Sequence, residues 1–150
     1  MNKLKRDYGE ENSINLKLVI AISRTQTAFS RNLQTFLNKY GLTIAQFGVL
    51  EALYHIGPMS IGALIDKNLS TSGNMTVVIR NLEKDGLVAR CVRETDRRAF
   101  EIKLTESGSV LIQKAFEMHL EVLEAYFKTL TPEDKNELMH LLKKLNGIQF

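Results

Sequence analysis

The chain lacks the features that mark secreted and membrane-spanning proteins. It has one cysteine, Cys91, which excludes an internal disulfide framework and indicates a reducing compartment. No apolar run approaches the roughly 18 residues that span a bilayer. The opening residues, MNKLKRDYGEEN, contain no apolar segment of the secretory-signal type. We therefore expect a cytoplasmic protein with no membrane partner.

Catalytic and metal-binding motifs are also missing. There is no G-x-S-x-G, phosphate-binding loop, H-E-x-x-H or dinucleotide fingerprint, and no Cys/His or Ser/His pair has a supporting context. The three histidines, His55, His119 and His140, form no H-x-x-x-H pair that would suit zinc. The sequence therefore predicts neither an enzyme, nor a cofactor, nor a metal site.

Charge is present in both signs, and its distribution is uneven. The formal net charge is only +3, which is too small to indicate a nucleic-acid partner. Residues 1–104 carry 15 basic and 10 acidic side chains, whereas residues 105–150 carry 5 basic and 7 acidic ones. This asymmetry suits a polyanion bound near the middle of the chain. At 150 residues, with 44% hydrophobic and 25% charged residues, the chain is long enough for one globular domain.

Apolar periodicity predicts four helices in the first half of the chain. Helical spacing of apolar residues runs over residues 14–38, and Gly41 provides the stop of this long helix. The second begins at a T-x-x-Q capping box, Thr43 to Gln46, and ends before Pro58. Its inward residues are expected to be Phe47, Leu50, Leu53 and Tyr54. A short third helix begins at Ser60, with Met59 placed to pack on Leu64, and the fourth spans residues 71–85.

The second half combines a β-hairpin with two further helices. The stretches Leu87 to Val92 and Ala99 to Leu104 alternate like strands, and the polar residues 93–98 join them. Phe100, Ile102 and Leu104 share one face. Thr105 then caps a long helix, and Thr131-Pro132 opens the last one. The predicted fold is mainly α with a small β-hairpin wing (α+β).

The fourth helix has two different faces. Met75, Val78, Ile79 and Leu82 recur at helical spacing and form a stripe that we expect to be buried. The other face starts with small polar residues, which would let the helix backbone approach base edges in a DNA major groove. The hydroxyl and amide groups of these residues, and the free N–H groups of the first turn, could contact bases or phosphates. Ser, Thr and Asn at a helix start also serve as ordinary caps. The outward residues are Ser72, Gly73, Asn74, Thr76, Val77 and Arg80.

The hairpin connection is basic. Arg97 and Arg98 suit an adjacent minor groove, whose negative potential attracts arginine, and Asp96 can hold one guanidinium by a bidentate pair. A solvated turn with local ion pairing is the alternative. A short helix, a tight turn, a two-faced helix and a basic hairpin together predict a winged helix-turn-helix over residues 42–105.

Two runs, LSTSGNMTVVIRNLEKDGLVAR and DRRAFEIKLTESG, resemble the MarR family of bacterial transcription regulators. The resemblance extends from about Leu16 to Leu145 and includes the L-T-x-x-G segment that ends at Gly108. It implies a homodimer on a pseudo-palindromic operator, with dimerisation helices in residues 13–41 and 106–150. Helix 71–85 then enters the major groove, and wing 93–98 the minor groove. The candidate DNA-binding residues are Ser70, Thr71, Ser72, Gly73, Asn74, Thr76, Val77, Arg80, Asp96, Arg97 and Arg98.

Dimerisation also has physical support, since two linked half-sites roughly add their binding free energies. Both ends of the chain carry more apolar residues than one small core needs, although ordinary packing within the chain is an alternative. These residues are Leu16, Leu18, Val19 and Ile20 at one end, and Leu145, Ile148 and Phe150 at the other.

The resemblance further implies a small aromatic or phenolic effector in a crevice between the dimerisation helices and the winged region. Phe29, Arg24, Tyr54 and His55 are possible lining residues, but no motif assigns them. Cys91 lies on a wing strand and is interpreted as a small apolar filler rather than a redox sensor. The leading hypothesis is a dimeric, ligand-responsive repressor that binds double-stranded DNA. The alternative is a winged-helix protein–protein interaction module without DNA binding.

Overall fold

The computed structural model describes residues 7–68, 71–93 and 96–147, with the backbone alone for residues 93 and 96–99. The described chain is mainly helical with one two-stranded antiparallel hairpin, which confirms the predicted fold class. The elements are α1 (Glu10–Leu37), η1 (Asn38–Tyr40), α2 (Ile44–Ile56), α3 (Ile61–Lys67), α4 (Ser72–Lys84), β1 (Val88–Arg93), β2 (Asp96–Leu104), α5 (Glu106–Phe127) and α6 (Pro132–Asn146).

Helix boundaries follow the capping signals in the sequence. Thr43 and Gln46 form the predicted capping box: the Thr43 hydroxyl accepts from the Gln46 N–H at 3.2 Å, and the Gln46 side chain accepts from the Thr43 N–H at 2.9 Å. Thr131 forms a second box with Asp134, which fixes the start of α6. Gly41 has the left-handed φ of 66° expected of a helix stop. The first helix begins at Glu10, four residues earlier than the prediction of residues 14–38.

One hydrophobic core joins α2, α4, the hairpin and the first half of α5. Leu50, Ile79 and Ile102 have no exposed surface, and they come from α2, α4 and β2 respectively. Met59 lies next to the hairpin, because its backbone exchanges hydrogen bonds of 3.0 and 2.8 Å with Ile102. The core therefore sits in the winged region, and α4 is anchored to it.

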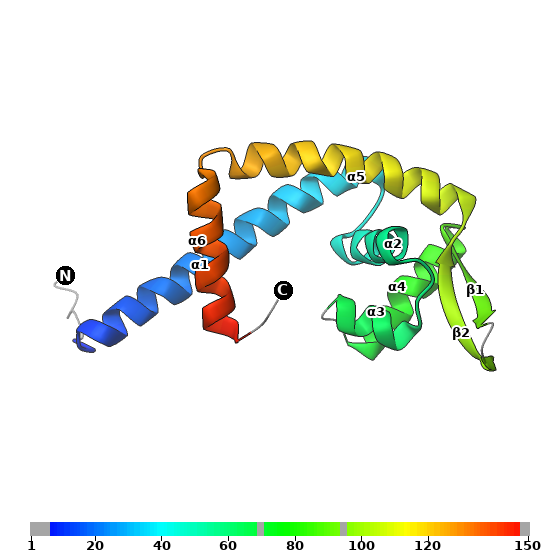
Figure 1. Cartoon of the computed structure of the whole chain (residues 1–150), viewed down its shortest axis with the longest axis horizontal. Helices are drawn as coiled ribbons and strands as arrows, with labels where there is room; N and C mark the ends of the chain where they lie inside the picture. The colour runs from blue at the N-terminus through cyan, green and yellow to red at the C-terminus, as the bar shows by residue number, and fades with distance from the viewer. Residues whose placement is uncertain (1–6, 69–70, 94–95, 148–150) are drawn as a thin grey trace, which may run out of the picture.

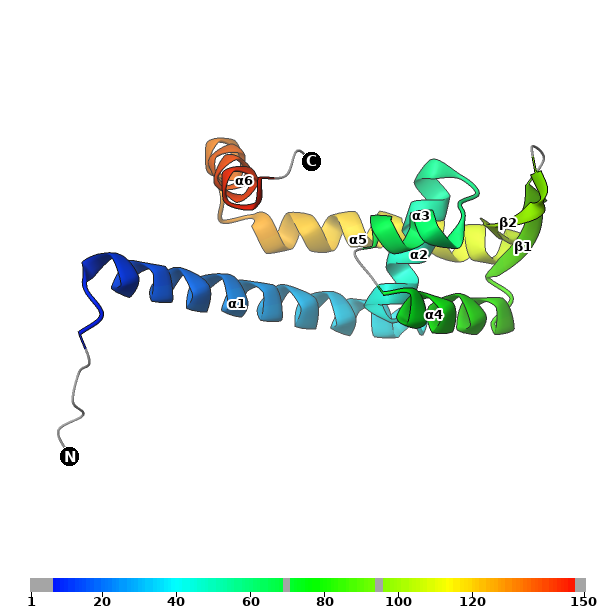
Figure 2. The ribbon, with the colours of Figure 1, turned by 90° about the horizontal axis from the view of Figure 1, so that it is seen from below.

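The long helices extend away from this core. α1 and α5 lie side by side where they meet the winged region, and α6 turns back from the far end of α5 (Figure 1). A second view shows that α6 stands apart from α1, on the other side of α5 (Figure 2). The apolar side chains on the first part of α1 and on α6 are consequently exposed to solvent. They include Leu16, Leu18, Val19 and Ile20 on α1, and Leu138, Leu141, Leu142 and Leu145 on α6.

One predicted inward residue, Tyr54, is exposed, and so is Phe100, which was predicted to share a face with Ile102 and Leu104. Tyr54 is 38% exposed, because it lies at the edge of the α2–α5 contact, where its ring touches those of His55 and Phe116. Phe100 is 56% exposed, because the hairpin projects beyond the core and only Ile102, further along the same face, is fully buried (Figure 1). Within the described part of the chain, no helix is both long and apolar enough to cross a membrane.

Candidate nucleic-acid interface

α4 has the two faces that the sequence predicts. Met75, Val78, Ile79 and Leu82 are buried against the core, which fixes the helix in position. The helix begins one residue later than predicted, at Ser72, because Thr71 is its N-cap: the Thr71 hydroxyl accepts from the Asn74 N–H at 3.3 Å. The opposite face is exposed and comprises Ser72, Gly73, Asn74, Thr76, Val77 and Arg80.

The fold gives no reason for a glycine at position 73. Its backbone is helical, and a Cβ placed there would meet nothing within 4 Å. Alanine would favour the helix more than glycine does. The absence of a side chain at Gly73 leaves open surface at the N-terminal end of α4. A close approach to base edges requires such a surface.

The end of α3 packs closely against α2. Ser60 caps α3 by accepting from the Ala63 N–H at 3.1 Å. Asn68 ends α3 and donates from its side chain to the Leu64 carbonyl at 2.9 Å. A Cβ on Gly48 of α2 would collide with the Asn68 amide, so the absence of a side chain there allows this close packing. Ser70, another predicted site residue, lies outside the described residues.

The wing is an antiparallel hairpin with an irregular outer end. Pairing is regular from Val88↔Leu104 to Val92↔Phe100, and then shifts so that Arg93 pairs with Asp96. Asp96, Arg97 and Arg98 therefore belong to β2, which corrects the prediction that residues 93–98 form the connection between the strands. The extra residues on β2 fit the bulge that this shift creates. The expected Asp96–Arg98 ion pair involves side chains outside the described part.

An ion pair that the sequence did not predict connects α4 with the hairpin. The Arg90 Nε on β1 lies 2.8 Å from Glu83 Oε1 on α4. This contact raises the pKa of Arg90, chiefly through the hydrogen bond and the negative charge of Glu83. No local pattern in the sequence links the two residues, since one belongs to a helix and the other to a strand.

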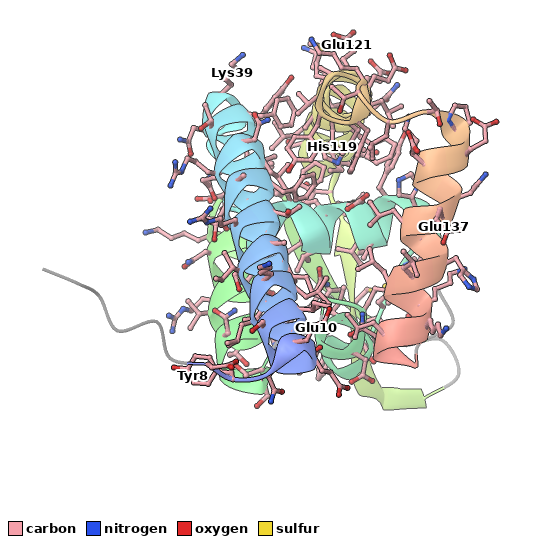
Figure 3. All side chains as sticks on the ribbon, turned by 90° about the vertical axis from the view of Figure 1, so that its left-hand side faces the viewer. Tyr8, Glu10, Lys39, His119, Glu121 and Glu137 are labelled. Atoms are coloured by element: carbon pink, nitrogen blue, oxygen red, sulfur yellow. The ribbon has the colours of Figure 1, made fainter. Side chains whose placement is uncertain are left out.

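A cavity of about 660 Å³ opens between α1, α2, α5 and the start of α4. Phe29 of α1 lines it, as the crevice prediction allowed, but Arg24, Tyr54 and His55 do not. Glu51 of α2 and His119 of α5 form a polar part of its wall. His119 is 8% exposed and points from α5 into the body of the protein, whereas Glu121 points away (Figure 3). Burial lowers the pKa of His119, although the charge of Glu51 opposes the shift.

Other candidate chemistry is sparse in the described part of the chain. In residues 7–68, 71–93 and 96–147, no three His, Cys, Asp or Glu side chains gather closely enough to hold a metal ion. Cys91 is half-buried, and its sulfur lies 3.5 Å from the Glu101 carbonyl oxygen in the hairpin.

A helix-turn-helix with an exposed, small-residue recognition helix and an adjacent hairpin defines the winged helix class of DNA-binding proteins. A MarR family model matches residues 40–99. The chain is also 34% identical over 137 residues to the HTH-type transcriptional regulator MhqR of Bacillus subtilis, covering 90% of this chain and 94% of the relative. The protein belongs to the MarR family of winged helix-turn-helix transcription regulators, and this is a family of DNA-binding proteins rather than enzymes.

Solved structures share the fold. A mutant of E. coli MarR complexed with operator DNA has a TM-score of 0.80 at 23% identity, covering 91% of this chain and 99% of that one. BpsR of Bordetella bronchiseptica, whose DNA binding is regulated by 6-hydroxynicotinic acid, has a TM-score of 0.77 at 24% identity, covering 86% and 92%. The organohalide-sensing RdhR-CbdbA1625 in its 2,4-dichlorophenol bound form has a TM-score of 0.80 at 21% identity, covering 98% and 89%.

Proposed function

We propose that the protein is a homodimeric, ligand-responsive repressor that binds a pseudo-palindromic operator. In this proposal α4 enters the major groove, and the wing, with Arg98 as its principal arginine, enters the minor groove. The observation that carries the proposal is the construction of α4: its apolar face is fixed in the core, and its polar N-terminal face is open to solvent. The fold shared with the E. coli MarR mutant that was solved in complex with operator DNA supports it.

The homodimer is supported by the exposed apolar residues at the two ends of the chain. Val19 on α1 is 61% exposed and Leu145 on α6 is 66% exposed, with apolar neighbours along both helices. A patch of this kind is unfavourable in water unless another surface covers it. A second copy of the chain, related by a two-fold axis, would cover both helices and would present two copies of α4 to successive half-sites.

The ligand response is supported by the cavity beside α4. Its wall includes Thr71 and Asn74 from the N-terminal end of that helix, so a bound molecule would touch the part of α4 that faces DNA. A chlorophenol and a hydroxylated aromatic acid are the ligands named for two proteins of the same fold. Repression by such a protein is relieved when the ligand favours a state that binds the operator less tightly.

Recovery of bound genomic fragments tests the proposed function. The full-length protein is mixed with sheared genomic DNA at low salt, and the retained fragments are sequenced. We expect a small set of fragments that share a pseudo-palindrome, bound on the order of 10³-fold or more tighter than random DNA. Affinity should fall steeply with salt as counterions are released. Retention of no fragment at low salt would instead favour a protein–protein interaction module.

A further inference from the structure

The wall of the cavity beside α4 combines apolar and polar side chains. Phe29, Leu33 and Met75 supply apolar surface suited to an aromatic ring. The polar residues of the wall are Glu51, Asn68, Thr71, Asn74 and His119. Among the described residues that line the cavity, Glu51 carries the only charged side chain, so the wall has no lysine or arginine to neutralise an acidic ligand.

Glu51 is the ionisable group of the wall that a bound molecule can reach. Nδ1 of His119 has no hydrogen-bond partner in the described residues, but it has almost no accessible surface. The Glu51 carboxylate is half-buried on α2, lines the cavity, and has no hydrogen bond or ion pair within the described part of the chain. It is therefore free to accept a hydrogen bond from a molecule in the cavity.

The charge of Glu51 separates two classes of aromatic ligand. A phenol is uncharged at neutral pH, and its O–H group can donate a hydrogen bond to a carboxylate. An aromatic carboxylate would bring a second negative charge next to the first, in a space partly closed to water, and like charges then repel strongly. Imidazole at His119 offers no compensating positive charge, because burial favours its neutral form.

We propose that this cavity binds uncharged hydroxylated aromatic molecules and excludes aromatic carboxylates, with Glu51 as the residue that makes the distinction. The proposal rests on the ligand response proposed above and names its ligand class. Glu51 accepts the hydrogen bond of the ligand hydroxyl, while the ring lies against Phe29 and Met75. A ligand held in this way also contacts the first turn of α4.

Three matched probes test the distinction in the full-length protein without DNA: 4-chlorophenol, 4-chloroanisole and 4-chlorobenzoate, titrated by calorimetry at pH 7. We expect the phenol to bind at least about tenfold more tightly than the benzoate, because only the benzoate is repelled by Glu51. The anisole, which is uncharged but has no O–H donor, should bind more weakly than the phenol. Equal affinity for phenol and benzoate, or no binding of the phenol at millimolar concentration, overturns the proposal.

Variants assign the effect to Glu51 and to this cavity. Glu51→Gln should bring the affinities for phenol and benzoate to within about threefold of each other, because it removes the charge and keeps the size. Glu121→Gln removes a charge from the outward face of α5 and should preserve the wild-type preference (Figure 3). Ala45→Phe places a ring in the cavity and should abolish phenol binding. An unchanged preference in Glu51→Gln would contradict the proposal.

DNA binding of the same proteins is measured separately by fluorescence anisotropy without any probe. This readout distinguishes the two proposals. Specific operator binding together with equal affinity for phenol and benzoate would refute the ligand class alone. A wild-type protein that binds no DNA sequence specifically would refute the proposed function.

Discussion

Glu83 and Arg90 form an ion pair that links the end of α4 to β1. Arg90 donates from Nε to Glu83 Oε1 at 2.8 Å and from Nη2 to Oε2 at 3.4 Å, so both carboxylate oxygens are engaged. The two side chains are 47% and 27% exposed, and water therefore weakens their attraction. The pair therefore affects the arrangement of the two elements more than the stability of the fold, because it connects the end of α4 to the first strand of the hairpin.

Arg90→Ala should reduce DNA affinity more than it reduces stability. The free energy of unfolding should fall by less than about 1 kcal/mol, as expected of a partly exposed ion pair. Operator affinity should fall several-fold in fluorescence anisotropy, because the wing loses its fixed position relative to α4. The exchanged pair Glu83→Arg with Arg90→Glu should recover part of the affinity. Failure of the exchange to recover any affinity would show that Arg90 acts on DNA directly.

Gly73→Ala should stabilise the protein and weaken its binding to DNA. Alanine favours the helix by up to about 1 kcal/mol, and nothing in the fold obstructs its methyl group. The same methyl group would lie on the surface that we propose to face the bases. Gly62→Ala is the matched control, because Gly62 occupies the same second position of α3 and is also exposed. Thermal unfolding and anisotropy together check this prediction: unchanged operator affinity in Gly73→Ala would show that this part of α4 does not approach DNA closely.

His119 should make the protein less stable in mild acid. Its pKa in the folded protein lies below the ordinary value of 6.5, because burial disfavours the charged form more than Glu51 favours it. Below pH 6.5 the unfolded chain takes up a proton that the folded protein does not, so the free energy of unfolding falls as the pH falls until the folded pKa is passed.

The variant His119→Phe should lose less stability than the wild type between about pH 7.5 and about pH 5.5, measured by urea unfolding at one protein concentration. Phenylalanine suits the site, since Phe36, Phe47 and Phe116 surround the imidazole. His140→Gln, on the exposed surface of α6, serves as the control. Identical pH dependence in His119→Phe and the wild type would contradict the assignment.

Val19→Glu should convert the protein from dimer to monomer. Val19 is 61% exposed on α1 beside other apolar residues, and burying a carboxylate in an apolar dimer interface would be unfavourable. Light scattering after gel filtration checks the mass. Val92→Glu, on the wing and 50% exposed, should remain dimeric. A wild-type protein that is monomeric at micromolar concentration would refute the homodimer.

Local signals in the sequence predicted the starts of α2, α3, α5 and α6. The caps at Thr43, Ser60, Thr105 and Thr131 depend on side chains that bond within their own first turn, so a short stretch of sequence determines them. The exposure of Tyr54 and Phe100 depends on where α2 and the hairpin meet the rest of the molecule, and no local pattern encodes that. The shifted pairing at Arg93 is likewise a property of two strands together.

The exposed side of α4 was predictable because one helical period determines it. The polar residues Glu51 and His119 of the cavity wall were not predicted, although part of the signal for His119 was present: Ile112, Ala115 and His119 recur at helical spacing, and all three are buried. This spacing places His119 on the inward face of α5. Its proximity to Glu51 depends on the packing of α2 against α5, which the sequence alone does not give.

The central claim is that the exposed face of α4 selects the DNA sequence while the wing supplies general affinity. The direct test measures binding of wild type, Thr76→Val and Arg98→Ala to a recovered operator and to duplexes that each carry one base-pair substitution. Thr76→Val keeps the shape of the side chain and removes its hydroxyl, which in the free protein donates to the Ser72 carbonyl at 2.9 Å. The account predicts a changed base preference at one or two adjacent positions of each half-site in Thr76→Val. It predicts a uniform loss of affinity in Arg98→Ala, with a salt dependence reduced by about two units of slope, one for each wing of the proposed dimer. The same ranking of duplexes for Thr76→Val and wild type, together with unchanged affinity in Arg98→Ala, would contradict it.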